Sequence, residues 1–185
     1  LDYKSVDNNS VLITPSEYIK YCDEEDLKIK YLDFNNAIHP YFFDMESILT
    51  KKGNDLLSLV FNDISVKDKS NIDVIFYPQK SAVEKLDFDY IKSNILKNQG
   101  ILDYEIERFP TKDGWKFPHL SSFYKEITKD KKLLILDDAA CSGDSILQLI
   151  DEVSFLEVKE IVIIILLARV SDQRAEFFSK ISEIK

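Results

Sequence analysis

Residues 133–145 have the sequence LLILDDAACSGDS, and this stretch decides the fold of the 185-residue chain. The four apolar residues Leu133–Leu136 form an uninterrupted run, which is typical of a β-strand that is covered on both faces. Asp137 and Asp138 follow the run directly, and mostly small residues continue to Ser145. The stretch therefore predicts a buried strand that leads through an acidic pair into a loop of small residues.

A helix and a second buried strand follow this loop. After the loop, apolar residues recur at helical spacing, namely Ile146, Leu149, Ile150 and Val153. Ile161–Leu167 is a second apolar run and is rich in β-branched residues. A strand, a helix and a strand at this spacing form a βαβ unit, which requires a parallel sheet. We therefore predict an α/β fold with a Rossmann-like central parallel sheet flanked by helices.

The segment before residue 100 adds helices and one strand. We expect a short helix over Met45–Thr50, which Gly53 separates from a longer helix capped by Asn54. Ile72–Tyr77 is short, rich in β-formers and followed by a proline, which predicts a strand. We expect a further helix over Ala82–Leu96.

Residues 101–120 predict a β-hairpin. Residues 102–107 alternate between apolar and acidic side chains, as in a half-exposed strand. The Asp113-Gly114 pair is typical of a hairpin tip, and Trp115–Leu120 supplies the returning strand. Two prolines interrupt these strands, which indicates an arm at an edge rather than a central strand. We divide the chain into an N-terminal extension (1–38), helical over Ser16–Asp26, and an α/β domain (39–185) that carries this hairpin.

The composition excludes several classes of protein. The net charge of −9 argues against a general nucleic-acid surface. The two cysteines, Cys22 and Cys141, are too few for a disulfide framework, which favours a reducing compartment. The longest apolar run, Ile161–Ala168, is too short to cross a bilayer, and the N-terminus lacks the regions of a signal peptide. We therefore expect a cytoplasmic protein that binds neither membrane nor nucleic acid. The chain does not begin with Met, so we also expect it to be trimmed or part of a longer protein.

The loop after the acidic pair has the chemistry of a sugar-phosphate site. In open α/β sheets, ligands bind beyond the carboxyl ends of the strands, where Asp137 and Asp138 lie. Small residues allow backbone amides to approach a phosphate, and the following helix adds its positive dipole end. Ser142 and Ser145 supply hydroxyl donors. The paired carboxylates are suited to ribose hydroxyls or to Mg²⁺ held through water. Because the whole chain is acidic, a polyanionic ligand makes a divalent cation more necessary.

These residues resemble the phosphoribosyl-pyrophosphate signature of type I phosphoribosyltransferases. The resemblance covers four apolar residues, an acidic pair and a small-residue loop ending in Ser-Gly-x-Ser at Ser145. It departs from the family pattern at Ala139, Ala140 and Cys141, where branched aliphatics and then Thr, Ser or Asp are usual. Members that place a loop carboxylate near the base carry it where this chain has Cys141. In the alternative interpretation, the aspartates only end a strand and Ser142 only caps a helix, which leaves the rest of the motif unexplained.

Three weaker motifs follow the family order. The segment His39–Met45 resembles the lead-in of the orotate phosphoribosyltransferase-like branch, and residues 78–82 stand where the pyrophosphate loop is expected. The resemblance implies that the 101–120 hairpin is a hood over the reacting centre, with Lys112 and Lys116 as catalytic cations for the departing pyrophosphate. It also implies Mg²⁺ near Asp137 and Asp138 and a substrate-binding set of Lys80, Ser81, Asp137, Asp138, Ala140, Cys141, Ser142, Gly143, Asp144, Ser145 and Arg169. In the alternative interpretation, Lys80, Lys112 and Lys116 are ordinary surface lysines, and Arg169 forms an ion pair at the end of a strand.

The sequence leaves three functions open. The first is an active phosphoribosyltransferase that transfers phosphoribose to a nitrogenous base with release of pyrophosphate. The second is a regulatory domain that binds phosphoribosyl pyrophosphate or a nucleotide without transfer. The third is an unrelated Rossmann-like enzyme that uses Asp137 and Asp138 for metal-dependent phosphate chemistry. A homodimer and membership in a larger assembly are both compatible with these functions.

Overall fold

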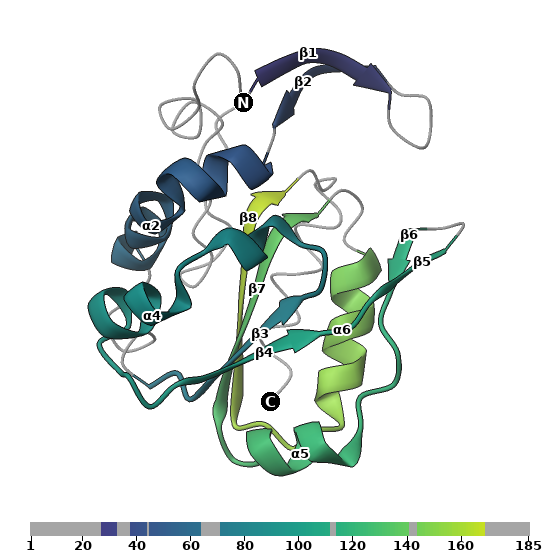
Figure 1. Ribbon diagram of the computed structural model, residues 1–185. Coiled ribbons are helices and arrows are strands. Elements are labelled where there is room, and N and C mark those ends of the chain that lie inside the picture. The colour runs from purple at the N-terminus through teal and green to yellow at the C-terminus, as the bar shows by residue number, and fades with distance from the viewer. Residues whose placement is uncertain are drawn as a thin grey trace.

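A four-stranded parallel sheet forms the centre of the molecule (Figure 1). The structure is a computed structural model that describes residues 27–32, 38–43, 45–63, 71–111, 114–140 and 144–168. The strands lie in the order β4 (Leu102–Ile106), β3 (Val74–Pro78), β7 (Lys132–Ala140) and β8 (Glu160–Ala168), and each neighbouring pair is parallel. The α/β fold with a Rossmann-like parallel sheet is confirmed.

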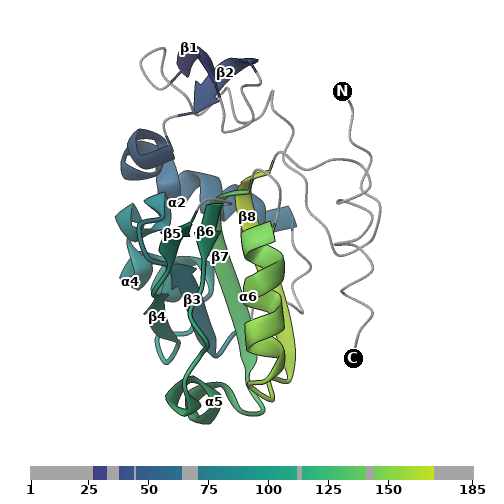
Figure 2. The same cartoon turned by 90° about the vertical axis from the view of Figure 1, so that its right-hand side faces the viewer.

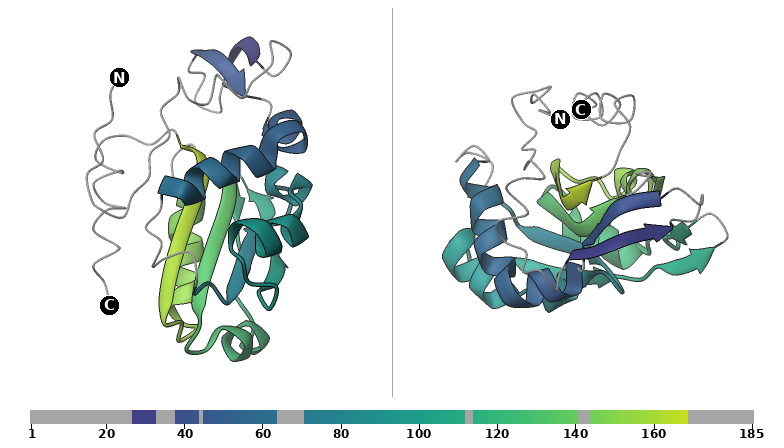
Figure 3. Two further views of the ribbon diagram at one scale, coloured as in Figure 1. Left: turned by 90° about the vertical axis from the view of Figure 1, so that its left-hand side faces the viewer. Right: turned by 90° about the horizontal axis from the view of Figure 1, so that it is seen from above.

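Helices cover both faces of this sheet because successive strand residues point in opposite directions. On one face, Leu134 and Leu136 of β7 pack into a core with α2 (Met45–Asp63). On the other face, Leu133 and Ile135 pack with α6 (Asp144–Ser154). Figures 2 and 3 show α2 and α6 on opposite sides of the strands. The four side chains of Leu133–Leu136 are fully buried, as the uninterrupted apolar run predicted.

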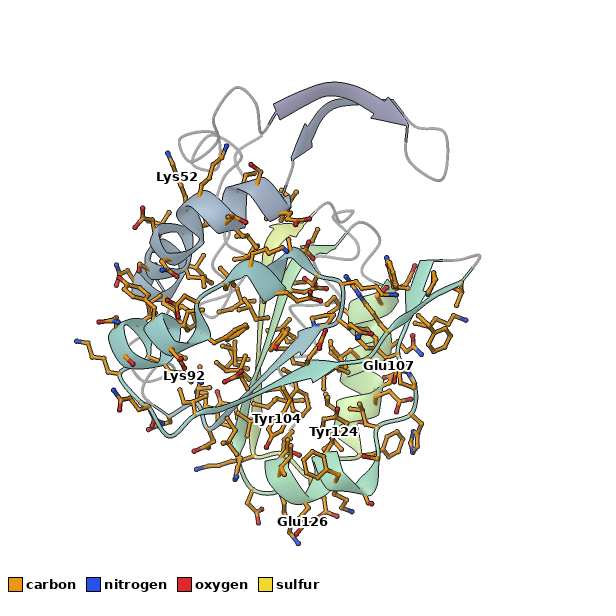
Figure 4. The ribbon with its side chains drawn as sticks, in the orientation of Figure 1. Lys52, Lys92, Tyr104, Glu107, Tyr124 and Glu126 are labelled. Carbon is orange, nitrogen blue, oxygen red and sulfur yellow. The ribbon has the colours of Figure 1, made fainter. Side chains whose placement is uncertain are left out.

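α5 (Ser122–Thr128) is an element that the sequence did not predict. It is held by an aromatic cluster with the sheet. The ring of Tyr124 makes edge contacts with Phe76 of β3 and with Tyr104 of β4, at centroid distances of 5.4 Å and 6.4 Å. Figure 4 shows Tyr104 and Tyr124 close together near α5. The helix therefore anchors the end of the sheet opposite to the carboxyl ends of the strands.

α2 is a single helix, so the predicted break at Gly53 is wrong. A Cβ atom at this position would collide with the Cδ2 atom of Leu86. The glycine is therefore explained by the close approach of Leu86 to the helix, and the helix continues through it.

The predicted helix over Ala82–Leu96 is also interrupted. A 3-10 turn (η2, Ala82–Lys85) ends at Leu86, and a short helical segment begins after Asp87, comprising α4 (Phe88–Tyr90) and the π-helical turn η3 (Ile91–Ile95). The Asp87 carboxylate accepts a hydrogen bond of 2.9 Å from the amide of Tyr90. This N-cap starts a new helix where the periodicity indicated a continuous one.

The hairpin is shorter than predicted. Leu102–Ile106 does not belong to it, because these residues pair with β3 in the main sheet as β4. The hairpin consists of β5 (Phe109–Thr111) and β6 (Gly114–Lys116), and Thr111 pairs with Gly114. Gly114 therefore begins the returning strand, which ends at Lys116 rather than at Leu120. The alternation in residues 102–106 identified a strand correctly but did not identify its partner.

A separate two-stranded antiparallel sheet precedes α2. It pairs β1 (Leu27–Leu32) with β2 (Ile38–Phe43), so the predicted division at residue 38 falls at the start of β2. The predicted helix over Ser16–Asp26 lies outside the described residues. Within the described part of the chain, no helix combines the length and apolar character that a membrane span requires.

We predict that Gly53→Ala lowers the free energy of unfolding by up to about 2 kcal/mol, because overpacking against Leu86 outweighs the gain in helix propensity. The measurement is urea denaturation. In a Leu86→Ala background the collision is absent, and the same substitution is expected to stabilise the helix by about 1 kcal/mol. Stabilisation of the parent protein by Gly53→Ala would contradict this packing.

Candidate functional site

Two loops meet at the carboxyl ends of β3 and β7. The hydroxyl of Ser81, from the loop after β3, lies 3.0 Å from Oδ1 of Asp137 and 2.8 Å from Oδ1 of Asp138. The amide of Ala82 donates to Oδ2 of Asp138 at 3.1 Å. Asp137 and Asp138 lie in β7 beyond the last residues that pair with β3. The structure therefore joins residues of the two predicted phosphate loops by direct hydrogen bonds.

The two aspartates have different environments. Asp137 is 1% exposed, and its Oδ1 also accepts from the amide of Asp138 at 2.9 Å. Burial, followed by the charge and hydrogen bond of Asp138, raises the pKa of Asp137 to about 7, although Arg108 and Ser81 oppose the increase. Asp138 is only partly buried. Asp138 is therefore the carboxylate of the pair that a ligand can reach.

The loop after β3 has an unusual backbone at Lys80. This residue has a φ of 58°, in the left-handed region that glycine usually occupies. The Lys80 amide donates to a carboxylate oxygen of Glu84. The Lys80 ammonium lies 5.7 Å from the centre of the Trp115 ring, which belongs to β6. Lys80 is thus exposed at the same edge of the sheet as the acidic pair.

Arg108 is a site residue that the sequence analysis missed. It is 8% exposed and lies between β4 and β5. Its Nε donates to the carbonyl of Gln79 at 2.5 Å, and one Nη donates to the carbonyl of Lys80 at 2.8 Å. Its guanidinium carbon lies 4.7 Å from the centre of the Trp115 ring. The signal available in the sequence was its place two residues after a predicted strand, since parallel strands end at one edge of the sheet.

Side chains of α6 form hydrogen bonds with backbone groups of the hairpin and of the segment that follows it. Ser145 Oγ donates to the Trp115 carbonyl at 2.9 Å. The Gln148 side chain accepts from the Phe117 amide at 3.3 Å and donates to the Phe117 carbonyl at 3.1 Å. Glu152 accepts from the Leu120 amide at 3.1 Å. The Ser145 hydroxyl, predicted as a phosphate donor, therefore donates to the hairpin in this structure.

The remaining predicted residues divide into described and undescribed ones. Lys116 is exposed at the end of β6, Asp144 is exposed at the start of α6, and Ala140 is the last residue of β7. The roles of these residues stay predictions. The following predicted residues lie outside the described part of the chain: Lys112, Cys141, Ser142, Gly143 and Arg169.

The carboxylates of the site fit a magnesium ion that takes only some of its ligands from the protein. Mg²⁺ typically binds through one or two carboxylates and completes its shell with waters and substrate phosphates. Asp138 offers such a carboxylate, because it is partly exposed beside the buried Asp137. Among the described residues, no group of three or more His, Cys, Asp or Glu side chains is arranged to hold a metal by itself.

Comparisons with known proteins support the fold. No protein-family model matches the sequence, and no curated protein matches it. An adenine phosphoribosyltransferase structure is 16% identical with a TM-score of 0.51, and the match covers 88% of this chain and 92% of that one. Orotate phosphoribosyltransferase from Francisella tularensis is 14% identical with a TM-score of 0.48, and 90% of each chain is covered. At this level of identity the likeness concerns the fold, and the chain has the fold of type I phosphoribosyltransferases.

We predict that ionisation of Asp137 destabilises the folded protein. Its pKa is about 7 in the folded state and close to the ordinary 3.8 when unfolded, so the folded state retains a proton between these values. The free energy of unfolding therefore falls as pH rises from about 4 to about 7, by up to ~1.4 kcal/mol per pH unit, and then levels off.

Urea denaturation across this pH range in the presence of a chelator measures the effect. Asp137→Asn keeps the acceptor oxygen but cannot ionise, so its stability is expected to lack this fall and to exceed that of the parent protein at pH 8. Asp55→Asn, at an exposed position of α2, is the matched control. An equal pH slope in Asp137→Asn and the parent protein would contradict the assignment.

Proposed function

We propose that this domain binds phosphoribosyl pyrophosphate with Mg²⁺ and transfers phosphoribose to a nitrogenous base with release of pyrophosphate. One observation carries the proposal. Ser81, in the loop expected to hold pyrophosphate, is hydrogen-bonded to Asp137 and Asp138, which are expected to hold the ribose. The fold supports the same function, since it is the fold of type I phosphoribosyltransferases. We further propose that the protein acts in the cytoplasm.

Each part of the site has a distinct task in this reaction. Asp138 accepts hydrogen bonds from the ribose hydroxyls, and the loop between β7 and α6 surrounds the 5′-phosphate. The base nitrogen attacks the anomeric carbon as the bond to pyrophosphate breaks, so no covalent enzyme intermediate is required. Negative charge grows on the leaving group, and Lys80 and the hairpin lysines Lys112 and Lys116 stabilise it electrostatically. Mg²⁺, when bound, supplies additional positive charge to the pyrophosphate oxygens.

A second candidate is a regulatory domain that binds the same ligand without transfer. The amide of Lys80 is already bonded to the Glu84 carboxylate, which an incoming phosphate oxygen must replace. The loop also has Cys141 where some family members have a carboxylate near the base. The first feature makes ligand binding compete with Glu84, and the second removes a carboxylate that could assist transfer, so both favour the regulatory function.

We predict that calorimetry detects binding of phosphoribosyl pyrophosphate in the presence of Mg²⁺. Asp138→Asn is expected to weaken this binding at least tenfold, because it removes a charged hydrogen-bond acceptor worth about 1.5–3 kcal/mol. Asp151→Asn, at an exposed position of α6, is the matched control. Pyrophosphate release across a panel of bases then separates the enzyme from the regulatory domain. Absence of binding in the parent protein would refute both functions.

We predict that Glu84→Gln raises the affinity for inorganic pyrophosphate, since it removes a competing anion from the Lys80 amide. A gain of roughly tenfold corresponds to ~1.4 kcal/mol, the size of one charge-assisted hydrogen bond. Glu126→Gln is the control, because Glu126 lies on α5 at the opposite end of the sheet (Figure 4). Unchanged or weaker binding by Glu84→Gln would show that the carboxylate does not compete with the ligand.

A further inference from the structure

Arg108 is a buried cation with two backbone carbonyls as partners. Its side chain donates to the carbonyls of Gln79 and Lys80, which are consecutive in the loop after β3. Burial of a guanidinium group costs several kcal/mol unless hydrogen bonds compensate for the lost water. Arg108 is 8% exposed, so these two hydrogen bonds compensate for the removal of its guanidinium group from water. A cation placed in this way fixes the positions of both peptide groups.

The orientation of these peptide groups determines where the loop presents its amide. In a planar trans peptide, the carbonyl and the N–H point in opposite directions. Because Arg108 binds the Gln79 carbonyl, the N–H of Lys80 points away from Arg108, and there it meets the Glu84 carboxylate. The Lys80 amide is therefore held in an orientation in which it already binds an anionic oxygen.

Arg108 also acts on the conformation and side chain of Lys80. A left-handed backbone is unfavourable for a non-glycine residue, and the hydrogen bond to the Lys80 carbonyl contributes to holding the φ of 58°. The cationic groups of Arg108 and Lys80 lie 4.7 Å and 5.7 Å from the centre of the same Trp115 ring. Arg108 thus contacts the backbone on both sides of Lys80 and also the Trp115 ring, beside which the Lys80 ammonium lies.

We propose that Arg108 is a positioning residue for the diphosphate group of the ligand. It acts through the backbone of Gln79 and Lys80 and does not itself contact the ligand. This inference rests on the proposed function and names the residue that orients the pyrophosphate loop. The planar fork of a guanidinium group is needed, because a lysine has a single ammonium and cannot hold two carbonyls in the same geometry.

The test compares two ligands that occupy different parts of the proposed site. Inorganic pyrophosphate probes the loop at Lys80, and ribose 5-phosphate probes the loop between β7 and α6. Arg108→Lys is expected to weaken pyrophosphate binding at least tenfold while ribose 5-phosphate binds as in the parent protein. Lys132→Met is the matched control. Lys132 is also a buried cation, and it forms an ion pair with Glu160 of β8. It lies at the start of β7, which is the end of the sheet opposite to the site. This variant is expected to lose stability but to keep both affinities.

The outcomes separate the inference from the proposed function. Equal pyrophosphate affinity in Arg108→Lys and the parent protein overturns the positioning role, and so does a parallel loss of both ligands, which indicates general destabilisation. If the parent protein binds neither ligand, the proposed function fails together with the inference. Arg108→Gln, which keeps a side-chain amide donor without the charge, is the second variant if Arg108→Lys does not fold, and the same selective loss of pyrophosphate is expected.

Discussion

The hydroxyl of Ser81 lies between the carboxyl groups of Asp137 and Asp138, and the geometry of the whole site depends on this contact. β3 and β7 are adjacent and parallel, so their carboxyl ends lie at one edge of the sheet, but strand pairing alone does not set the distance between the loops that follow. The serine hydroxyl and the Ala82 amide set it by binding the same acidic pair. Because Ser81 is 3% exposed, water does not compete effectively for these hydrogen bonds.

A chain of contacts extends from this point to the hairpin and to α6. Ser81 follows Lys80, whose carbonyl is bound by Arg108, and Arg108 lies over the ring of Trp115. The carbonyl of Trp115 accepts from Ser145 at the start of α6. The hairpin is therefore linked both to the loop after β3 and to the start of α6. A hairpin attached in this way does not need a large apolar interface with the domain, and Phe109 on β5 is indeed 45% exposed.

The sequence predicted the parts of this arrangement that follow from local patterns. The apolar run at Leu133–Leu136 predicted a buried central strand, and parallel topology then placed Asp137 at the ligand edge. The sequence did not predict that Leu102–Ile106 pairs with β3, since alternation specifies a half-exposed strand but not its neighbour. The close approach of Leu86 to Gly53 and the burial of Arg108 were not predicted either, because both depend on contacts between residues distant in sequence.

The backbone at Lys80 shows how a loop with few glycines can hold a glycine-like conformation. A glycine at this position would remove the steric cost of a positive φ, but it would also remove the ammonium group that we propose for the pyrophosphate. The chain retains the lysine, and interactions elsewhere compensate. Arg108 binds the carbonyls of Gln79 and Lys80, and the amide of Gln79 donates to the Ile106 carbonyl at 2.8 Å. The loop is therefore stabilised by β4 and the residues after it, which explains why a buried arginine stands two positions beyond the end of that strand.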